Sequence, residues 1–320
     1  MNFWDELPDG FLILAPMEEV TDIIFRHTVA KAGRPEVFYT EFTNAASFCS
    51  EAGRLATAGR LAHDSGESPL VAQIWGTNPV QFAVMSQALR EQGFDGVDIN
   101  MGCPAKHVVK SGAGSGLIGQ TDLAARLIEA AKAGGLPVSV KTRLGVRHTD
   151  EWRPWLTALL EQNIVNLTVH LRTRKEMSKV PAHYELIDEI CALRDSIAPQ
   201  TKLTINGDIR DRNHARELKL AHPGVNGFMI GRGVFANPFC FADSPEEHTQ
   251  AELIELMRYQ LDQYDEYRII NEKFTRKFDP LKHFFKIYLN GFNGAAKVRD
   301  AAYNCTTTEA VRQVLKQAGL

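Results

Sequence analysis

The sequence predicts a (β/α)8 TIM barrel followed by a C-terminal all-helical domain. Eight short apolar runs alternate with helix-like segments at a spacing of about 25 to 40 residues, as strand–helix units require. Each run ends in a polar or glycine-rich loop, and a barrel builds its active site from such loops. After about residue 242 only helical periodicity remains. The expected strands are Phe11–Pro16, Val37–Phe42, Leu70–Trp75, Gly96–Met101, Val138–Arg143, Leu167–Arg172, Leu203–Asp208 and Phe228–Gly233.

The strands are expected to be covered on both faces. The runs Pro137–Lys141 and Leu167–His170 are mostly β-branched, which is typical of buried parallel strands. An open, doubly wound sheet is the alternative arrangement of the same units. The barrel is favoured because all eight runs end in polar or glycine-rich loops that would lie on one side.

Two helices show clear boundaries in the sequence. Asn78 fits an N-cap, Pro79 fits the first helical position, and Gly93 fits just past the C-terminus. Thr121 and Gly134 bracket the next helix in the same way.

The chain is expected to have two domains, a barrel over residues 1–243 and a helical domain over residues 244–320. Ala251 to Ile270 is amphipathic and helical, and no strand run follows it. The stretch from Asn271 to Arg299 is basic, whereas Pro245 to Glu266 is acidic, so this region is polarised. Aromatic residues interleaved with the basic ones, Phe284 among them, are expected to belong to the core. The basic residues are Lys273, Arg276, Lys277, Lys282, Lys286, Lys297 and Arg299.

Composition sets further bounds. The 320 residues are 44% hydrophobic, enough for the core of one large domain and an appendage. The net charge of −3 does not by itself indicate a nucleic-acid partner. The five cysteines form no CxxC pair, so neither a disulfide framework nor a zinc site is expected. No signal-peptide pattern or membrane-length apolar run is present, which favours the reducing cytoplasm.

Cys103 is the first candidate for chemistry. It lies in Gly102-Cys103-Pro104, directly after an expected strand and before a glycine-rich loop at 111–116 that is expected to be flexible. A thiol in that position could act as a nucleophile or a proton donor. The other four cysteines are more simply explained as small buried residues.

Lys141 and His170 end two successive strands, so both are expected at the same barrel rim. A lysine there could bind an anionic cofactor or form a Schiff base. The triplets 206–208 and 231–233 (NGD and GRG) close the last two strands, where barrels often bind phosphate through backbone N–H groups. No metal site is expected, because the glutamates near strand ends have no histidine at ligand spacing.

Taken in order, these motifs resemble those of the bacterial tRNA-dihydrouridine synthase family. The match is dense from about residue 12 to 240 and weaker in the helical region. No single triplet is diagnostic, but the cysteine turn together with the others in sequence is specific. The matching motifs are Ala15-Pro16-Met17, Val20-Thr21-Asp22, Thr40-Glu41-Phe42, Gln73, Asp98–Pro104, Lys106, Ser111–Ser115, Val140-Lys141-x-Arg143, His170-x-Arg172-Thr173, Asn206-Gly207-Asp208, Gly231-Arg232-Gly233, Lys282-x-x-x-x-Lys286 and Gly294-Ala295.

The resemblance implies a barrel with a helical tRNA-binding domain, a bound FMN, and NADPH or NADH as reductant. Its reaction reduces C5=C6 of specific D-loop uridines in tRNA, with hydride from FMN to C6 and a proton from Cys103 to C5. A monomer without metal or membrane contact is expected. The implied isoalloxazine contacts are Pro16, Met17, Gln73, Lys141 and His170. The implied contacts of the ribityl phosphate are Asn206, Gly207, Asp208, Gly231 and Arg232. The implied substrate contacts are Asn100, Lys106, Arg143, Arg172, Lys282 and Lys286.

Some positions depart from the family pattern. Leu171 stands where glycine usually follows the histidine, and Glu18-Glu19 replace small residues. Gly116 stands where alanine is common, and Tyr184 is the nearest aromatic residue beyond Thr173. These departures concern the choice of target site and the fine substrate contacts more than cofactor binding.

Three other functions remain open. An FMN-dependent small-molecule pyrimidine oxidoreductase, of the dihydroorotate or dihydropyrimidine type, explains the barrel but gives the basic tail no role. A Schiff-base aldolase using Lys141 needs no flavin and would be colourless. A non-catalytic RNA-binding module explains the tail but not a thiol and a lysine on one rim.

Overall fold

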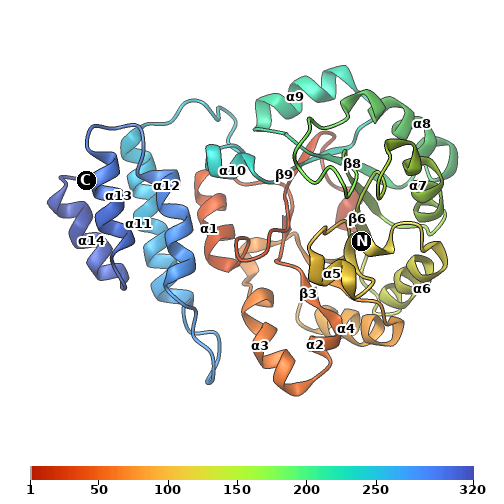
Figure 1. Ribbon diagram of the computed structural model, residues 1–320, viewed down its shortest axis with the longest axis horizontal. Helices are drawn as coiled ribbons and strands as arrows, with labels where there is room; N and C mark the ends of the chain where they lie inside the picture. Colours follow the sequence, from red (N-terminus) through yellow and green to blue (C-terminus); the bar gives the residue numbers. More distant parts are fainter. Residues whose placement is uncertain (1) are drawn as a thin grey trace.

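The computed structural model describes residues 2–320 and shows parallel strands surrounded by helices, with further helices at one end (Figure 1). The sheet has the order β1-β9-β8-β7-β6-β5-β4-β2, and β3 pairs with β4. The strands are β1 (Phe11–Leu14), β2 (Phe38–Tyr39), β3 (Thr43–Asn44), β4 (Leu70–Trp75), β5 (Gly96–Met101), β6 (Val138–Arg143), β7 (Asn166–His170), β8 (Lys202–Asn206) and β9 (Gly227–Ile230).

The two ends of this sheet meet. The Val37 N–H donates to the Leu12 carbonyl, and the Leu14 N–H donates to the Val37 carbonyl, each at 3.2 Å. Ile13 and Val37 form a parallel bridge, so β1 lies beside the start of β2. These contacts close a parallel barrel and rule out the open sheet, so the predicted fold class is confirmed.

The second strand differs from its prediction. The expected run 37–42 was too long, because β2 covers only Phe38–Tyr39. Thr40 ends it: its Oγ1 accepts the Gln73 N–H of β4 at 3.1 Å, where a longer strand would offer a carbonyl. The chain then pairs briefly again as β3, beside the last residues of β4. The other seven runs overlap observed strands.

Helices cover the outside of the barrel. The predicted start of α4 is confirmed, because the Asn78 side chain accepts the Val80 N–H at 2.9 Å. The predicted cap at Thr121 is wrong by one residue. Gln120 holds the N-cap position, and its side chain donates to the Gly116 carbonyl at 2.5 Å instead of capping. The helices are α1 (Ile23–Ala32), α2 (Ala45–Phe48), α3 (Glu51–Leu61), α4 (Pro79–Glu91), α5 (Lys106–Lys110), α6 (Thr121–Lys132), α7 (Trp152–Leu160), α8 (Ile187–Ile197), α9 (Arg212–Ala221) and α10 (Gly233–Ala236).

The floor of the barrel is apolar. Trp4, in the short 3-10 helix η1 (Phe3–Asp5), is buried against the ring of Phe11 with centroids 5.9 Å apart. Polar side chains begin higher inside the barrel, where the Tyr39 hydroxyl lies 3.3 Å from Ser139 Oγ. This gradient places the polar, ligand-accessible end at the C-terminal ends of the strands.

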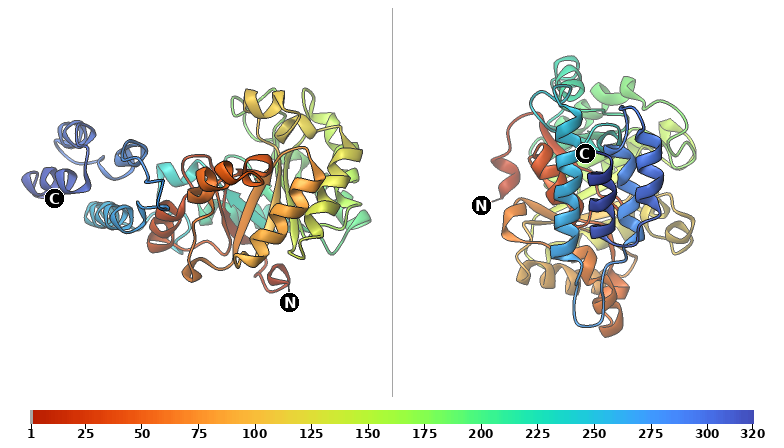
Figure 2. Two further views of the ribbon diagram at one scale, coloured as in Figure 1. Left: turned by 90° about the horizontal axis from the view of Figure 1, so that it is seen from below. Right: turned by 90° about the vertical axis from the view of Figure 1, so that its left-hand side faces the viewer.

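The C-terminal helices form a group beyond α1, at one end of the barrel (Figures 1 and 2). The predicted helix 251–270 was too long, since α11 ends at Tyr267 and Ile269 then pairs with Thr275 in a short antiparallel bridge. Phe284 and its aromatic neighbours Phe285 and Tyr288 are buried, as expected of core residues. The elements are α11 (Gln250–Tyr267), the 3-10 helix η6 (Asp279–Phe284), α12 (Phe285–Tyr288), α13 (Ala295–Tyr303) and α14 (Thr308–Gln317).

These helices share a packed junction with the barrel. Phe25 of α1 stacks on Phe284 with ring centroids 4.6 Å apart. Arg276 donates to Asp22 at 2.9 Å and to the Gly59 carbonyl at 2.8 Å. In the described residues, no helix is long and apolar enough to cross a membrane.

Candidate active site at the barrel mouth

Two cavities open at the C-terminal ends of the strands. The larger has a volume of about 500 Å³ and the smaller of about 170 Å³, and they share Pro16, Lys141 and Arg143. The two cavities are therefore neighbours, and together they form the recess of the mouth. The predicted site residues that line the larger cavity are Pro16, Met17, Lys141, Arg143, His170, Arg172, Asn206, Gly207, Asp208, Gly231 and Arg232. Those that line the smaller one are Pro16, Gln73, Asn100, Cys103, Lys141 and Arg143.

Three predicted substrate contacts lie outside the recess. Lys106 is exposed at the first residue of α5. Lys282 is only 16% exposed and pairs with Asp279 at 2.8 Å. Lys286 is exposed on α12, and no ion pair engages it among the described residues.

Cys103 sits in a turn that is held from both sides. Its N–H donates to Asn100 Oδ1 at 2.9 Å, and its carbonyl accepts from the Ser115 backbone and hydroxyl at 3.0 and 2.9 Å. The segment 111–116, expected to be a flexible loop, includes part of an ordered 3-10 helix, η3 (Gly114–Leu117). Burial raises the pKa of the Cys103 thiol, so it stays protonated at neutral pH.

Lys141 reaches into the recess from β6. Its Nζ donates to Asn206 Oδ1 at 3.0 Å, and Asn206 Nδ2 donates to the Met229 carbonyl at 2.8 Å. Burial, reinforced by the neighbouring Arg143, lowers the pKa of Lys141 to about 8, while Asp98 opposes this shift. The ammonium is therefore mostly charged at pH 7 and titrates just above it.

His170 is held neutral in one tautomer. Arg172 donates to His170 Nε2 at 3.1 Å and to the Val180 carbonyl at 2.6 Å, and it also pairs with Asp208. Burial and nearby cations lower the pKa of His170 well below its usual value. An Nε2 that accepts leaves Nδ1 to carry the proton. Arg172 is 2% exposed, and its N–H groups donate to partners inside the protein. The sequence pattern could not reveal these partners.

The loop after β8 takes a conformation that favours glycine. Gly207 has φ +122°, and an added Cβ would lie 3.1 Å from Ala182 Cβ and from His170 Cδ2. The Tyr184 hydroxyl donates to the Gly207 carbonyl at 2.7 Å and so fixes this loop. The sequence singled out Tyr184 only as the nearest aromatic residue beyond Thr173. Its hydrogen bond joins residues 23 positions apart in the chain, which a local pattern does not predict.

The larger cavity carries an excess of positive charge. Its only carboxylate among the described residues is Asp208, which pairs with Arg172 and, at 3.0 Å, with Arg232. The remaining cations, with the open backbone at the ends of β8 and β9, suit an anionic group such as a phosphate. The cationic residues of this wall are Lys141, Arg143, Arg172, Arg210 and Arg232.

The recess fits a flavin nucleotide in its donor set. One end is cationic, as a phosphate requires. Lys141, which lines both cavities, and Gln73, which lines the smaller one, offer an ammonium and an amide for ring carbonyls and nitrogens. Pro16, Met17 and Met229 supply apolar wall to the larger cavity.

The residues that depart from the family pattern lie around the recess. Leu171 is fully buried, and its N–H donates to the Asn206 carbonyl at 3.0 Å. Glu18 pairs with Arg60 of α3, and Glu19 donates its N–H to Glu41 at 2.7 Å. Burial raises the pKa of Glu41 to about 7. None of these side chains lines either cavity of the mouth.

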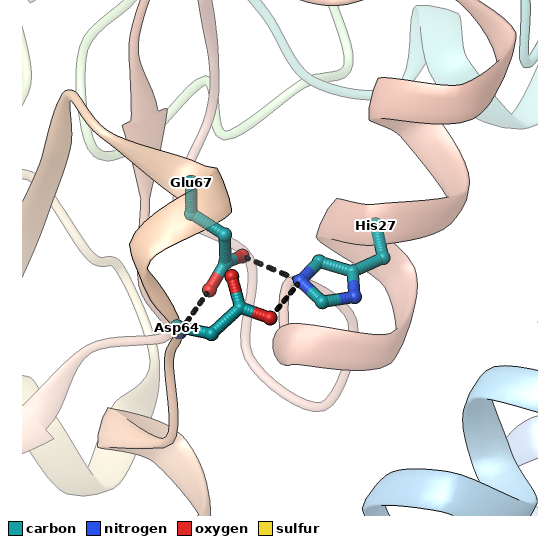
Figure 3. A group of neighbouring side chains, drawn as sticks. All are labelled: His27, Asp64 and Glu67. Carbon is teal, nitrogen blue, oxygen red and sulfur yellow. Dashed lines mark hydrogen bonds and ion pairs between the residues drawn. The ribbon is translucent and has the colours of Figure 1, made fainter.

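A separate cluster joins α1 to the 3-10 helix η2 (Ser65–Glu67) (Figure 3), and none of its residues lines either cavity of the mouth. His27 Nε2 lies 3.2 Å from Asp64 and 3.9 Å from Glu67, a grouping that could bind a cation. However, the buried Arg26 donates to both Glu67 oxygens, at 2.6 and 2.9 Å. A metal ion would have to compete with this guanidinium, so the cluster is better explained as an ion-pair network. The expectation of no metal stays a prediction.

Asp98 is the clearest residue that the sequence left without a role. It is fully buried in β5, and its carboxylate bonds to Ser139 and Gln73, each at 2.7 Å. The available signal was a carboxylate in an otherwise apolar strand.

Known proteins resemble this chain over nearly its whole length. A family profile described as "Dihydrouridine synthase (Dus)" matches residues 13–319. The chain is 56% identical over 315 residues to "Probable tRNA-dihydrouridine synthase 2" of Bacillus subtilis (strain 168), covering 98% of this chain and 95% of that protein. It is 53% identical over 316 residues to "Probable tRNA-dihydrouridine synthase" of Staphylococcus aureus (strain COL), covering 99% and 95%.

Solved structures with low sequence identity share the fold. A 2-naphthoyl-CoA reductase complex superposes with TM-score 0.55 at 8% identity, over 75% of this chain and 50% of that one. Histamine dehydrogenase from Rhizobium sp. 4-9 gives TM-score 0.54 at 11% identity, over 79% and 48%. The family match spans both the barrel and the C-terminal helices, and the relatives match nearly end to end. This chain belongs to the dihydrouridine synthase family.

Proposed function

We propose that this protein reduces specific uridines in tRNA to 5,6-dihydrouridine, with FMN as its cofactor and NADPH or NADH as the reductant. The observation that carries the proposal is the recess that joins the protonated thiol of Cys103 to Lys141 and a cationic end. Family membership and the names of the relatives support the reaction and the tRNA substrate.

The residues of the larger cavity would hold the flavin. Gly207, Gly231 and Arg232 would bind its phosphate end, while Lys141 and Gln73 would bind the ring. When bound, the flavin supplies a hydride to C6 of the pyrimidine. His170, neutral with a proton on Nδ1, would add a hydrogen-bond donor without adding charge. The other cofactor contacts proposed here are Pro16, Met17, Asn206 and Asp208.

Cys103 would act as the general acid. Reduction at C6 leaves negative charge at C5, which a protonated thiol can neutralise. The raised pKa of Cys103 keeps that proton in place before the reaction. Arg143 would orient the base: its Nε donates to the Gly102 carbonyl at 2.8 Å and its NH1 to the Met177 carbonyl at 2.9 Å, which leaves NH2 for a ligand. Asn100 also lines this end of the recess.

The tRNA would be gripped outside the recess. A stacked base cannot reach the mouth, so the uridine must be flipped out while basic residues hold the backbone. We assign this work to residues 244–320, where Lys286 is exposed without an ion pair among the described residues. Lys282 is held by Asp279 and contributes less. Arg276 is bound to Asp22 and serves the junction. The other exposed lysines of this region are Lys273, Lys277, Lys297 and Lys316, and Lys106 is a further candidate near the mouth. Arg172 is buried and bonded to Val180, His170 and Asp208, so we assign it to the wall of the recess and not to the tRNA backbone.

A spectrum and a product assay test the proposal together. The purified protein is expected to be yellow and to release FMN on denaturation. With NADPH and unmodified tRNA it should form dihydrouridine, measured by mass spectrometry of tRNA digests. A small-molecule pyrimidine oxidoreductase would instead turn over orotate or free uracil and leave tRNA unchanged. A colourless folded protein that takes up no FMN would support the aldolase, and tRNA binding without turnover would support the binding module.

We also propose that the protein is a monomer and works in the reducing cytoplasm. Size-exclusion chromatography with light scattering tests the monomeric state.

A further inference from the structure

A buried carboxylate beneath the mouth has no role in the reaction as described so far. Asp98 is fully buried in the middle of β5 and lines neither cavity. Burial raises the pKa of Asp98 to about 6, so the group is mostly ionised at neutral pH. A buried ionised carboxylate is costly to keep unless hydrogen bonds compensate it.

Asp98 begins a chain of side-chain hydrogen bonds that ends at the cysteine turn. Its Oδ1 accepts from Ser139 Oγ and its Oδ2 from Gln73 Nε2, each at 2.7 Å. Gln73 Oε1 then accepts from Asn100 Nδ2 at 2.9 Å. Asn100 Oδ1 in turn accepts from the Cys103 N–H at 2.9 Å. The side chains of Asp98, Ser139, Gln73 and Asn100 are all buried.

The chain has only one consistent direction. A carboxylate accepts but cannot donate, so Gln73 must turn its NH₂ group to Asp98 and its oxygen to Asn100. Asn100 must then turn its NH₂ group to Gln73 and its oxygen to the turn. The backbone N–H of Cys103 needs that oxygen, because two donors cannot pair. The acceptor at position 98 is therefore the terminal group that satisfies the whole chain.

We propose that Asp98 is a positioning residue for Cys103, acting through Gln73 and Asn100 to hold the turn that presents the thiol. The inference rests on the proposed role of Cys103 as the acid. Asp98 touches neither substrate nor cofactor in this scheme. Removing its carboxylate leaves the Gln73 amide without a buried acceptor, and Asn100 loses its fixed partner. The thiol then spends less time where it can give up its proton.

The test compares variants of Asp98 and of Gln73, the two residues that the first hydrogen bond of the chain joins. Asp98→Ala removes the acceptor. Asp98→Asn keeps it, because the amide can turn its oxygen to Gln73 and its NH₂ group to Ser139 Oγ. Ser139→Ala is the matched control, since it removes the other hydrogen bond of the same carboxylate and leaves the chain intact. Gln73→Glu sets two carboxylates side by side, and combining it with Asp98→Asn restores the link with donor and acceptor exchanged.

Two readouts are needed. The first is the rate at which iodoacetamide alkylates Cys103 in the flavin-loaded protein without tRNA, followed by peptide mass spectrometry. Cys305, half-buried in the C-terminal region, is the internal reference. The second is the single-turnover rate of dihydrouridine formation, divided by the rate at which NADPH reduces the bound cofactor. This ratio isolates the step that uses the thiol.

In Asp98→Ala we expect the ratio to fall by about tenfold, as one unmade buried hydrogen bond implies. Alkylation of Cys103 should accelerate, while that of Cys305 stays unchanged. Asp98→Asn and Ser139→Ala should leave alkylation at the wild-type rate. Gln73→Glu should alter it, and the double variant Gln73→Glu with Asp98→Asn should return it towards wild type.

Three results would overturn the inference: wild-type alkylation and ratio in Asp98→Ala, equal effects of Asp98→Ala and Ser139→Ala, or no recovery in the double variant. If Asp98→Ala fails to fold, Gln73→Glu and the double variant still decide the question. A wild-type protein that forms no dihydrouridine would contradict the proposed function, while the alkylation series would still test the positioning role.

Discussion

Burial acts on the two reactive side chains of the mouth in a way that suits reduction of a pyrimidine. It raises the pKa of Cys103, which keeps the thiol protonated, and it lowers the pKa of Lys141 to about 8. In both cases the charged form is disfavoured by desolvation. Below about pH 8 the site therefore holds a proton donor and a cation at the same time.

Replacing Cys103 with alanine should separate the two halves of the reaction. The variant is expected to bind FMN and to accept electrons from NADPH at the normal rate, because the thiol serves only the protonation of C5. Dihydrouridine formation should fall by about 10² to 10⁴, the usual contribution of a general acid. Single-turnover assays on tRNA measure this step, with Cys305→Ala as the control. Near wild-type product formation in Cys103→Ala would show that another group supplies the proton.

The pH dependence should report Lys141. A lysine with a lowered pKa is charged below that value, so kcat/KM that requires the ammonium should decline as pH rises through about 8. Asp98 raises the pKa of Lys141, so Asp98→Asn should move this decline to lower pH. Profiles of both proteins on tRNA check the direction. An unshifted or upward-shifted limb in the variant would mean that a different group titrates.

Strand-end residues were predictable because barrel chemistry recurs at one place in each unit. Cys103, Lys141 and His170 were found by that rule, and the structure brings them to one mouth. Asp98 and Tyr184 were not given roles, because each acts through a partner 23 to 41 residues away in the chain. Such contacts exist only after the strands are in register.

Element boundaries were predictable where the local sequence pattern alone decides them. The strands 70–75, 96–101 and 138–143 have the predicted bounds. The second strand ended early because the Thr40 hydroxyl takes a ladder position on β4. The helix α11 ended before its amphipathic pattern did, because the chain reverses so that Ile269 meets Thr275. Both misses reflect tertiary contacts that override a local pattern.

Lys282 and Lys286 belong to one sequence motif, but their replacement should affect tRNA binding differently. Lys286→Glu should weaken binding and flatten the slope of log K against log salt by about 0.7 to 0.9. Lys282→Glu should do less, because Lys282 is 16% exposed and already paired with Asp279. Filter binding over a range of salt concentrations measures both, with FMN absorbance as the control for folding. A larger effect of Lys282→Glu would show that its ion pair opens when RNA binds.

At the scale of the whole molecule, the C-terminal helices and the barrel share one junction. Phe25 of α1 stacks on Phe284, and Phe235 stacks on Phe284 with centroids 6.4 Å apart. Arg276 of the tail reaches Asp22, and the Tyr267 hydroxyl reaches Asp64 at 2.8 Å. A mobile clamp would not need this packing. The arrangement therefore indicates that the recess and the basic surface keep a fixed geometry.

Thermal unfolding should accordingly be a single cooperative event. All four tryptophans (Trp4, Trp75, Trp152 and Trp155) precede residue 244, so their fluorescence reports the barrel, whereas far-UV circular dichroism reports all helices. Phe284 is 5% exposed, and Phe284→Ala should cost about 3 to 5 kcal/mol by leaving a cavity at the junction.

If the two parts unfold together, both signals should shift to a lower Tm by the same amount. Phe274→Ala, at an exposed position between α11 and η6, should leave both signals unchanged. If Phe284→Ala lowers only the dichroism transition, the helices unfold independently of the barrel. The basic surface proposed to hold the tRNA could then move relative to the mouth. The distance between the bound tRNA backbone and the flipped-out uridine would then be set by tRNA binding rather than by the fold.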